Sequence, residues 1–413
     1  MATSSSSPSA ESAWPLPAAR PEEVGLSSER LARMRTALEL EVAEQRIPGA
    51  VVAVARRGRL AVLEAVGKLD PAGSAPMQAD AVFSIASMTK LMVSTAIMML
   101  YEEGRLLLTD PAAKYLPELA EMKVAVTSPG GAMTLVAAER PFTIQDLLRH
   151  TSGLTYRDRG TSEAHKLYPG SSTTAAVRLT KAEFLGALAK VPLVYQPGTT
   201  WEYGFSTDVL GLVVEAVTGK SLGEALRERL WAPLGMRDAG FALSDAQQSR
   251  YARAFPNDVL TGQPIAIHHA TGKSFKFESG GGGMVATAAD YMRFLEMLRR
   301  GGELDGQRYL GRKTVDYMTA DHLGSHVVNR ITTMDAACVG YGFGLGVAVR
   351  MQTGVAGLHG SKGDYYWSGA YGTYFWVDPA EELCTVFMAA APGQIRLRYR
   401  QLLRALVLQA ITD

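Results

Sequence analysis

The chain has 413 residues, of which 47% are hydrophobic and 20% charged, and its formal net charge is +1. This composition predicts a globular protein with a large core arranged in two lobes. Because the charges are balanced and form no basic stripe, nothing indicates binding to nucleic acid or to an anionic membrane surface. We therefore expect the partner to be a small, largely uncharged molecule, and we make no prediction of the oligomeric state.

The N-terminal sequence MATSSSSPSAESAWPLPAAR has neither the basic start nor the apolar stretch of a signal peptide. It favours a disordered tail over residues 1–24. The apolar run at residues 91–100 is half the length that a membrane-spanning helix needs. These features predict a cytoplasmic protein without a membrane segment.

The two cysteines, Cys338 and Cys384, lie in or near apolar, strand-like segments and favour free thiols over a disulfide. The adjacent pair His268 and His269 lacks the i,i+4 spacing with which two imidazoles on one helix face bind a metal. We therefore expect no metal site and no cofactor.

In chain order, residues 27–46 have helical periodicity, and residues 50–67 form two β-rich runs that read as a hairpin turning at Gly58. Residues 87–285 are mostly helical pieces joined by loops rich in glycine and proline. Residues 286–413 contain short β-rich runs such as YGTYFWVD and ELCTVFMAAA, and they end in a helical pattern.

Strands at both ends of the chain with helices between them predict an α/β (α+β) fold. We expect one antiparallel sheet flanked by helices, built from residues 25–86 and 286–413, with the mainly helical lobe 87–285 inserted. Catalytic groups would then meet where the two lobes meet.

Two motifs suggest catalysis but have simpler explanations. The GKSLG sequence at 219–223 matches a nucleophile elbow, but it follows a helical pattern where an elbow needs a strand. It instead predicts a glycine helix cap followed by a capping box of Ser221 and Glu224. The glycine run at 278–290 lacks a Walker pattern and predicts a turn lining the cleft, followed by a helix capped by Thr287.

The sequence SIASMTK at residues 84–90 places Ser87 three residues before Lys90, at the start of an apolar helix. Residues three apart share a helix face, so the amine can reach the serine hydroxyl. A desolvated lysine gives up its proton more readily, and its neutral amine can then accept the serine proton. The helix N-terminal amides also favour the developing negative charge.

SIASMTK resembles the first motif of the serine β-lactamase and penicillin-binding-protein superfamily. PFTIQDLLRHTSGL at 141–154, the segment 196–236, GGGGMVATAADYMRFLEML and WSGAYGTYFWVDP are similar to its class C branch, and the likeness covers residues 25–410. Within that branch the sequence most resembles the β-lactamase-like carboxylesterases of family VIII. The resemblance implies their fold and a serine esterase activity.

The resemblance assigns Ser87 as nucleophile, Lys90 as its activating partner and Tyr203 in WEYGFS as the second-motif tyrosine. A tyrosine beside an ammonium can ionise, take the proton from Ser87 and return it to the leaving alkoxide. Whether Lys90 or Tyr203 is the general base stays open at this point.

The third motif departs from the lactamase pattern. Where those enzymes carry Lys-Thr-Gly, this chain has Trp367, Ser368 and Gly369, and Phe205 replaces the second-motif asparagine. These residues are the predicted substrate contacts, and the loss of the lysine predicts neutral, apolar acyl groups. An amide near Gly369 or Ala370, with that of Ser87, is the expected oxyanion hole.

The sequence thus predicts a hydrolase that cleaves short- to medium-chain carboxylic esters through an acyl-enzyme formed on Ser87. Three alternatives stay open. They are a β-lactamase or D-peptidase of the same fold, an acyltransferase that passes the acyl group to an alcohol, and a catalytically inactive binding protein.

Overall fold

The fold is built around a seven-stranded sheet with the strand order β2-β1-β13-β12-β11-β10-β9. The computed structural model describes residues 15–128 and 130–413. The N-terminal strand β1 pairs antiparallel with the C-terminal strand β13, Ala50 opposite Ala389, so the two ends of the chain share one sheet. All pairs in this sheet are antiparallel, which confirms the predicted fold class.

The helices of the described residues are α1 (Ser28–Ala43), α2 (Thr89–Glu102), α3 (Ile144–Leu148), α4 (Glu163–Leu167), α5 (Ser172–Arg178), α6 (Lys181–Leu188), α7 (Ser206–Thr218), α8 (Leu222–Leu226), α9 (Asp245–Gln248), α10 (Ala288–Arg299), α11 (Arg312–Met318) and α12 (Arg396–Leu408). The strands are β1 (Gly49–Arg56), β2 (Arg59–Gly67), β3 (Phe83–Ser84), β4 (Lys123–Thr127), β5 (Met133–Ala137), β6 (Val285–Ala286), β7 (Glu303–Leu304), β8 (Gln307–Arg308), β9 (Tyr341–Phe343), β10 (Ala348–Arg350), β11 (Tyr365–Ser368), β12 (Tyr374–Asp378) and β13 (Leu383–Ala389).

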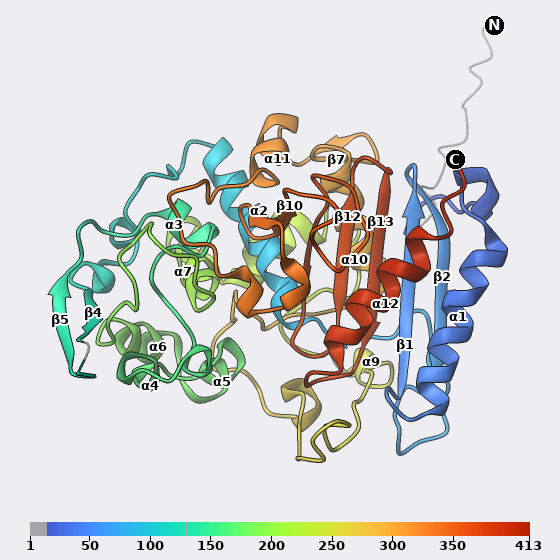
Figure 1. Ribbon diagram of the computed structural model, residues 1–413, viewed down its shortest axis with the longest axis horizontal. Coiled ribbons are helices and arrows are strands. Elements are labelled where there is room, and N and C mark those ends of the chain that lie inside the picture. The colour runs from blue at the N-terminus through green and yellow to red at the C-terminus, as the bar shows by residue number, and fades with distance from the viewer. Residues whose placement is uncertain (1–14, 129) are drawn as a thin grey trace, which may run out of the picture.

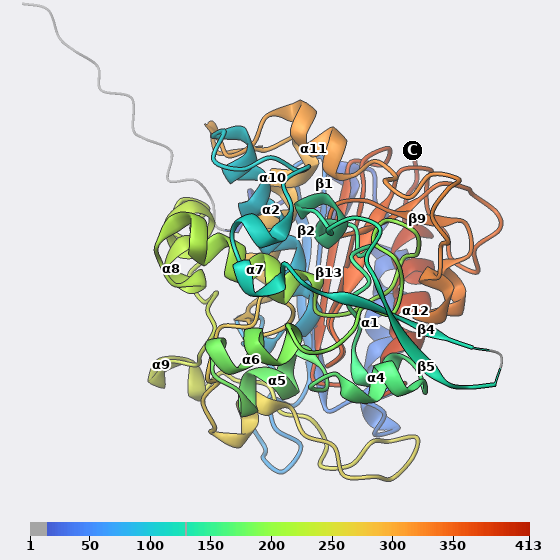
Figure 2. The same ribbon diagram turned by 90° about the vertical axis from the view of Figure 1, so that its left-hand side faces the viewer.

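Helices cover both faces of the large sheet (Figures 1 and 2). Helices α1 and α12 pack together on one face, and α10 lies across β1 and β13 on the other. Helices α3 to α7 form a lobe to one side, from which the β4–β5 hairpin projects away from the sheet. Helix α2, which follows the Ser87 segment, packs on α7 and so connects the helical lobe to the centre of the molecule. Within the part of the chain that the structure describes, no helix is long and apolar enough to cross a bilayer.

The N-terminal hairpin forms as predicted, but the tail is shorter than predicted. Strands β1 and β2 turn at Arg57 and Gly58, which both have positive φ, as a tight two-residue hairpin turn requires. Residues 15–24, assigned to the disordered tail, pack on the body instead. Ala18 bridges to Leu60, and Leu16 is buried. The short apolar side chains of this segment gain enough burial to hold it in place. Residues 1–14 lie outside the described residues.

The helix caps predicted at the two motifs that mimic catalytic sequences are present. Gly219 is in the left-handed conformation and ends α7, and the Ser221 hydroxyl accepts the Glu224 amide while the Glu224 carboxylate accepts the Ser221 amide. Thr287 caps α10 by accepting the Asp290 amide at 3.1 Å. Both cysteines are buried free thiols.

A buried ionic cluster fixes the start of β11, the strand whose other end lies at the Ser87 segment. Arg350 and Arg404 both bind the Asp364 carboxylate, at 2.7 and 2.8 Å, and Tyr341 donates its hydroxyl to it at 3.0 Å. The Arg350, Arg404 and Asp364 side chains have no exposed area. Asp364 is therefore the shared anionic partner of two guanidinium groups that water cannot reach.

Replacing Asp364 with alanine is expected to lower the free energy of unfolding by roughly 3–5 kcal/mol, because it leaves two buried cations unpaired. The matched control is Asp316→Ala, which removes an exposed i,i+4 pair with Arg312. This substitution should change the free energy of unfolding by less than about 0.5 kcal/mol. Urea unfolding of both variants measures the difference. Equal destabilisation by the two substitutions would show that the cluster is unimportant for stability.

Candidate active site

Ser87 lies in a 3-10 turn, Ala86–Met88, that runs directly into α2. The preceding residue, Ala86, has φ +43°, a left-handed conformation that an alanine adopts only when its surroundings enforce it. The neighbouring backbone supplies that constraint: Ile85 donates its amide to Met284 O at 3.0 Å, and β3 pairs with β6. Ser87 is half-buried and faces a cavity, while its neighbours on both sides are buried.

Lys90 is 1% exposed, and its ammonium group is held on three sides. The Nζ atom donates to Ser87 Oγ at 3.3 Å, to the Tyr156 hydroxyl at 3.3 Å and to the carbonyl of Gly281 at 2.5 Å. The structure therefore brings Ser87 and Lys90 together, as their spacing predicts. It also shows two partners of Lys90, Tyr156 and Gly281, that the sequence did not indicate.

Tyr203 lies next to Lys90 in the same site. Lys90 Nζ lies 4.6 Å from the centre of the Tyr203 ring, and the Trp367 indole N–H donates to the Tyr203 hydroxyl at 3.3 Å. Tyr203 thus contacts both the buried cation and the third-motif tryptophan. The ring of His150 packs 4.9 Å away, and burial together with Lys90 holds the pKa of His150 well below its usual value. His150 is therefore a neutral packing partner of Tyr203.

The end of β11 is fixed against the segment that carries Ser87. A side chain on Gly369 would overlap the carbonyl of Ile85, so only glycine allows this approach. The Thr373 hydroxyl donates to that carbonyl at 3.1 Å, and the Gly369 amide donates to Thr373 O at 2.8 Å. The Gly369 donor is thus used within the turn, whereas Ala370 is exposed and lines the same cavity as Ser87.

Phe205 does not lie where the sequence placed it. Its side chain has no exposed surface, and it packs on Tyr156, with ring centres 4.8 Å apart, and on Phe184. Phe205 therefore packs behind Tyr156 and is out of reach of a substrate. A phenylalanine at this position gains more from burial in an aromatic cluster than from facing the cleft.

A buried polar network behind Lys90 was missed at the sequence level. The Tyr156 and Ser172 hydroxyls lie 2.5 Å apart, and Ser172 donates to Asp208 at 2.6 Å. Asp208 also accepts the Ser279 hydroxyl at 2.5 Å and the Gly281 amide at 3.0 Å. Burial raises the pKa of Asp208, and the nearby ammonium of Lys90 opposes that rise. The segments involved lie far apart in the sequence, so no local pattern could reveal the network.

A small cavity of about 70 Å³ joins most of the predicted site residues. It is lined by Ser87, Tyr203, Ile331, Met334, Asp335, Cys338, Tyr366, Trp367, Ser368, Ala370, Arg396 and Arg400. Arg400 pairs with Asp335 at 3.1 Å, and burial together with Arg400 lowers the pKa of Arg396 to about 10. The cavity wall is thus aromatic on one side but also carries positive charge that the sequence analysis did not assign.

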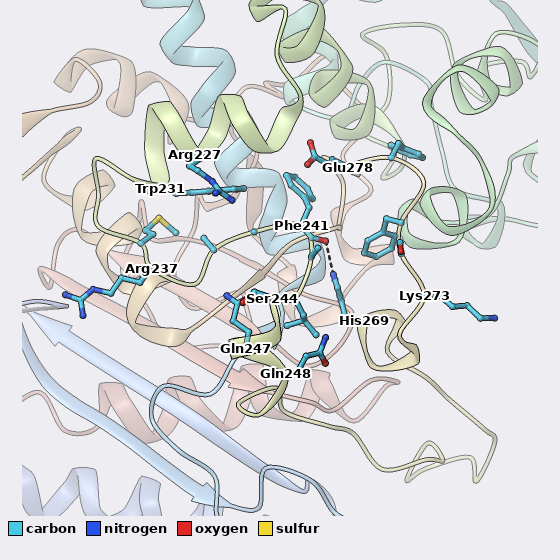
Figure 3. Close-up of a pocket in the computed structure, with 18 of the residues that line it drawn as sticks. Arg227, Trp231, Arg237, Phe241, Ser244, Gln247, Gln248, His269, Lys273 and Glu278 are labelled. Carbon is cyan, nitrogen blue, oxygen red and sulfur yellow. Dashed lines mark hydrogen bonds between the residues drawn. The ribbon is translucent and has the colours of Figure 1, made fainter.

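A larger cavity of about 780 Å³ lies apart from these residues (Figure 3). Its wall includes Trp231, Phe241 and His269, and His269 contacts Ser84, three residues before Ser87, at 2.7 Å. Burial lowers the pKa of His269 to about 4, so its ring is neutral near pH 7. None of the predicted catalytic residues lines this cavity, so the smaller cavity is the candidate active site.

Comparison with known proteins agrees with this geometry. The beta-lactamase family profile matches residues 34–409. The chain is 36% identical over 356 residues to protein Rv1367c of Mycobacterium tuberculosis, covering 83% of this chain and 85% of that one. It is 32% identical over 375 residues to esterase EstB of Burkholderia gladioli, covering 86% and 89%. Among solved structures, EstCE1, a hydrolase with promiscuous acyltransferase activity, superposes with a TM-score of 0.73 at 26% identity, covering 92% and 98%.

The fold and the serine-lysine pair at the helix start therefore define a serine hydrolase of the β-lactamase type. The chain belongs to the beta-lactamase family. Within it, the similarity to EstB and EstCE1 confirms the resemblance to the β-lactamase-like carboxylesterases.

Proposed function

We propose that this protein hydrolyses short- to medium-chain carboxylic esters through an acyl-enzyme on Ser87. The observation that carries the proposal is the hydrogen bond from the buried Lys90 to Ser87, at the mouth of a cavity that Tyr203 and Trp367 also line. Ser87 Oγ attacks the ester carbonyl and the alkoxide leaves with a proton. Water then attacks the acyl-enzyme and releases the acid.

The contacts of Lys90 favour Tyr203 as the general base. An ammonium has three N–H donors, and Lys90 faces three acceptors: Ser87 Oγ, the Tyr156 hydroxyl and Gly281 O. This environment suits the charged amine. Tyr203 lies beside this charge and accepts the Trp367 indole N–H, and we assign it to take the serine proton and return it to the leaving group.

We assign the oxyanion hole to the amides of Ser87 and Ala370. The Gly369 amide already donates to Thr373 O, which leaves Ala370 as the better placed of the two sequence candidates. Two backbone donors aimed at the carbonyl oxygen stabilise the tetrahedral intermediate in a site from which water is excluded.

The size and the aromatic wall of the cavity predict the substrate preference. Each methylene covered by Trp367 gains about 0.8 kcal/mol, so kcat/KM should rise up to roughly fourfold per methylene from acetate to butyrate esters. It should then fall for long chains, once the cavity of about 70 Å³ is filled. Kinetics on a p-nitrophenyl ester series measure this dependence.

Two comparators test the competing substrate classes. Nitrocefin reports β-lactam cleavage, which should be weak because Trp367 stands where lactamases carry a lysine. Mono-p-nitrophenyl glutarate carries a carboxylate that would be attracted to Arg396. The proposed preference for neutral acyl groups requires kcat/KM to be higher for the butyrate ester than for this glutarate ester. Nitrocefin turnover equal to that of butyrate would place the chain among the β-lactamases instead.

Acyl transfer is a second candidate activity, favoured by the similarity to EstCE1. The same acyl-enzyme can be attacked by an alcohol in place of water. Product analysis with added alcohol gives the partition between ester and acid. A constant acid yield at rising alcohol concentration would exclude it.

A further inference from the structure

We infer that Asp208 is the counter-ion of Lys90, held to it through two hydrogen-bonded paths, and that it sets the pH range in which Ser87 is activated. This inference rests on the proposed function and assigns a positioning role to a residue that does not touch the substrate.

Lys90 lacks a carboxylate among the groups to which it donates. Its hydrogen-bond acceptors are a serine hydroxyl, a tyrosine hydroxyl and a backbone carbonyl, which are all uncharged. An ammonium that is 1% exposed cannot be compensated by water. A buried cation of this kind requires a negative charge within reach.

The first path runs through side chains. Lys90 donates to the Tyr156 hydroxyl, that hydroxyl lies 2.5 Å from Ser172 Oγ, and Ser172 donates to Asp208 Oδ2 at 2.6 Å. Burial and the charge of Asp208 raise the pKa of Tyr156 well above its usual value, so its hydroxyl keeps its proton. The path therefore links Lys90 to Asp208 through hydroxyl groups that both stay uncharged.

The second path runs through one peptide unit on each side of Gly281. Its carbonyl accepts from Lys90 at 2.5 Å, and its amide donates to Asp208 Oδ1 at 3.0 Å. A side chain on Gly281 would overlap both the Asp208 carboxylate and Ser172, so the close approach depends on glycine. This gives a function to one residue of the glycine run at 278–290, which the sequence alone interpreted as a turn.

The charged and titratable groups around the pair come from several elements. Lys90 faces Tyr156, Tyr203 and His150, and Asp208 faces Lys90 and Tyr156. His150 is neutral and Tyr156 is protonated, so Asp208 carries the negative charge that balances Lys90. The Ser279 hydroxyl and the Gly281 amide stabilise that charge on Asp208.

The test is the pH dependence of Ser87 reactivity in Asp208→Asn. Removing the negative charge leaves the buried Lys90 without its counter-ion, so the whole pH profile of Ser87 reactivity should move to lower pH. The expected shift is on the order of one pH unit. It is measured as kcat/KM on p-nitrophenyl butyrate and as the rate of Ser87 labelling by a fluorophosphonate, in the full-length protein.

The matched control is Asp290→Asn. Asp290, on α10, is also fully buried, has its pKa raised to about 6 by burial and accepts the backbone amides of Arg237 and Asp238. Its substitution should leave the profile in place. A folded Asp208→Asn protein with an unshifted profile would overturn the inference, whatever its rate, because a merely structural role lowers the rate without moving the pH limbs.

If Asp208→Asn does not fold, Ser172→Ala decides the question. It breaks the side-chain path and leaves the Gly281 path, so a smaller shift in the same direction is expected, and no shift contradicts the inference. The proposed function fails differently: the wild-type protein would then neither hydrolyse the ester nor be labelled at Ser87. That result would overturn the inference as well, since no activated serine would exist.

Discussion

Ser87→Ala is expected to abolish ester hydrolysis, with a residual rate at least about 10⁴-fold below that of the wild type. The reason is that no other hydroxyl combines a hydrogen bond from Lys90 with exposure to the cavity beside Trp367 and Ala370 among the described residues. Steady-state kinetics on a butyrate ester give the rate. Because the serine is half-buried and small, the variant should fold normally.

The matched control for this loss is Ser221→Ala, which changes the serine of the misleading GKSLG sequence. Its hydroxyl caps α8 by accepting the Glu224 amide at 3.2 Å, so the variant should keep full activity and lose about 1 kcal/mol of stability. Peptide mapping after fluorophosphonate treatment should find the adduct on Ser87. An inactive but folded Ser221→Ala protein, or an adduct elsewhere, would contradict the assignment.

Much of the fold follows from local patterns in the sequence. The β1–β2 hairpin was predictable because alternating apolar residues flank Arg57 and Gly58, and the capping box at Ser221 because its residue types and spacing are specific. The packing of residues 15–24 was not predictable. That segment lacks periodicity of its own and is held by single contacts such as the bridge from Ala18 to Leu60.

The contact between Ser87 and Lys90 was readable from the sequence because the two residues are three apart on one turn of helix. The supporting groups were not, since Tyr156, Asp208 and Gly281 come from distant segments that only the fold brings together. The role of Phe205 was misread for a related reason. A motif position says which residue aligns, but whether its side chain faces the cleft depends on the aromatic neighbours around it.

Trp367 illustrates how structure adds to a motif assignment. The sequence indicated only that an aromatic residue replaces a lysine and would form a wall for the substrate. In the structure, its side chain is 5% exposed, and its indole N–H donates to the Tyr203 hydroxyl. The same substitution therefore removes a carboxylate-binding group and supplies a donor to the proposed base.

Tyr203→Phe distinguishes the two bases that the sequence leaves open. If Tyr203 carries the proton, kcat should fall by about 10² to 10⁴-fold with little change in KM, since the ring still packs against His150 and Trp367. Tyr168→Phe is the matched control: its hydroxyl donates to Pro192 O and takes no part in the site, so it should cost stability and leave kcat unchanged. A Tyr203→Phe protein with wild-type kcat would instead make Lys90 the base.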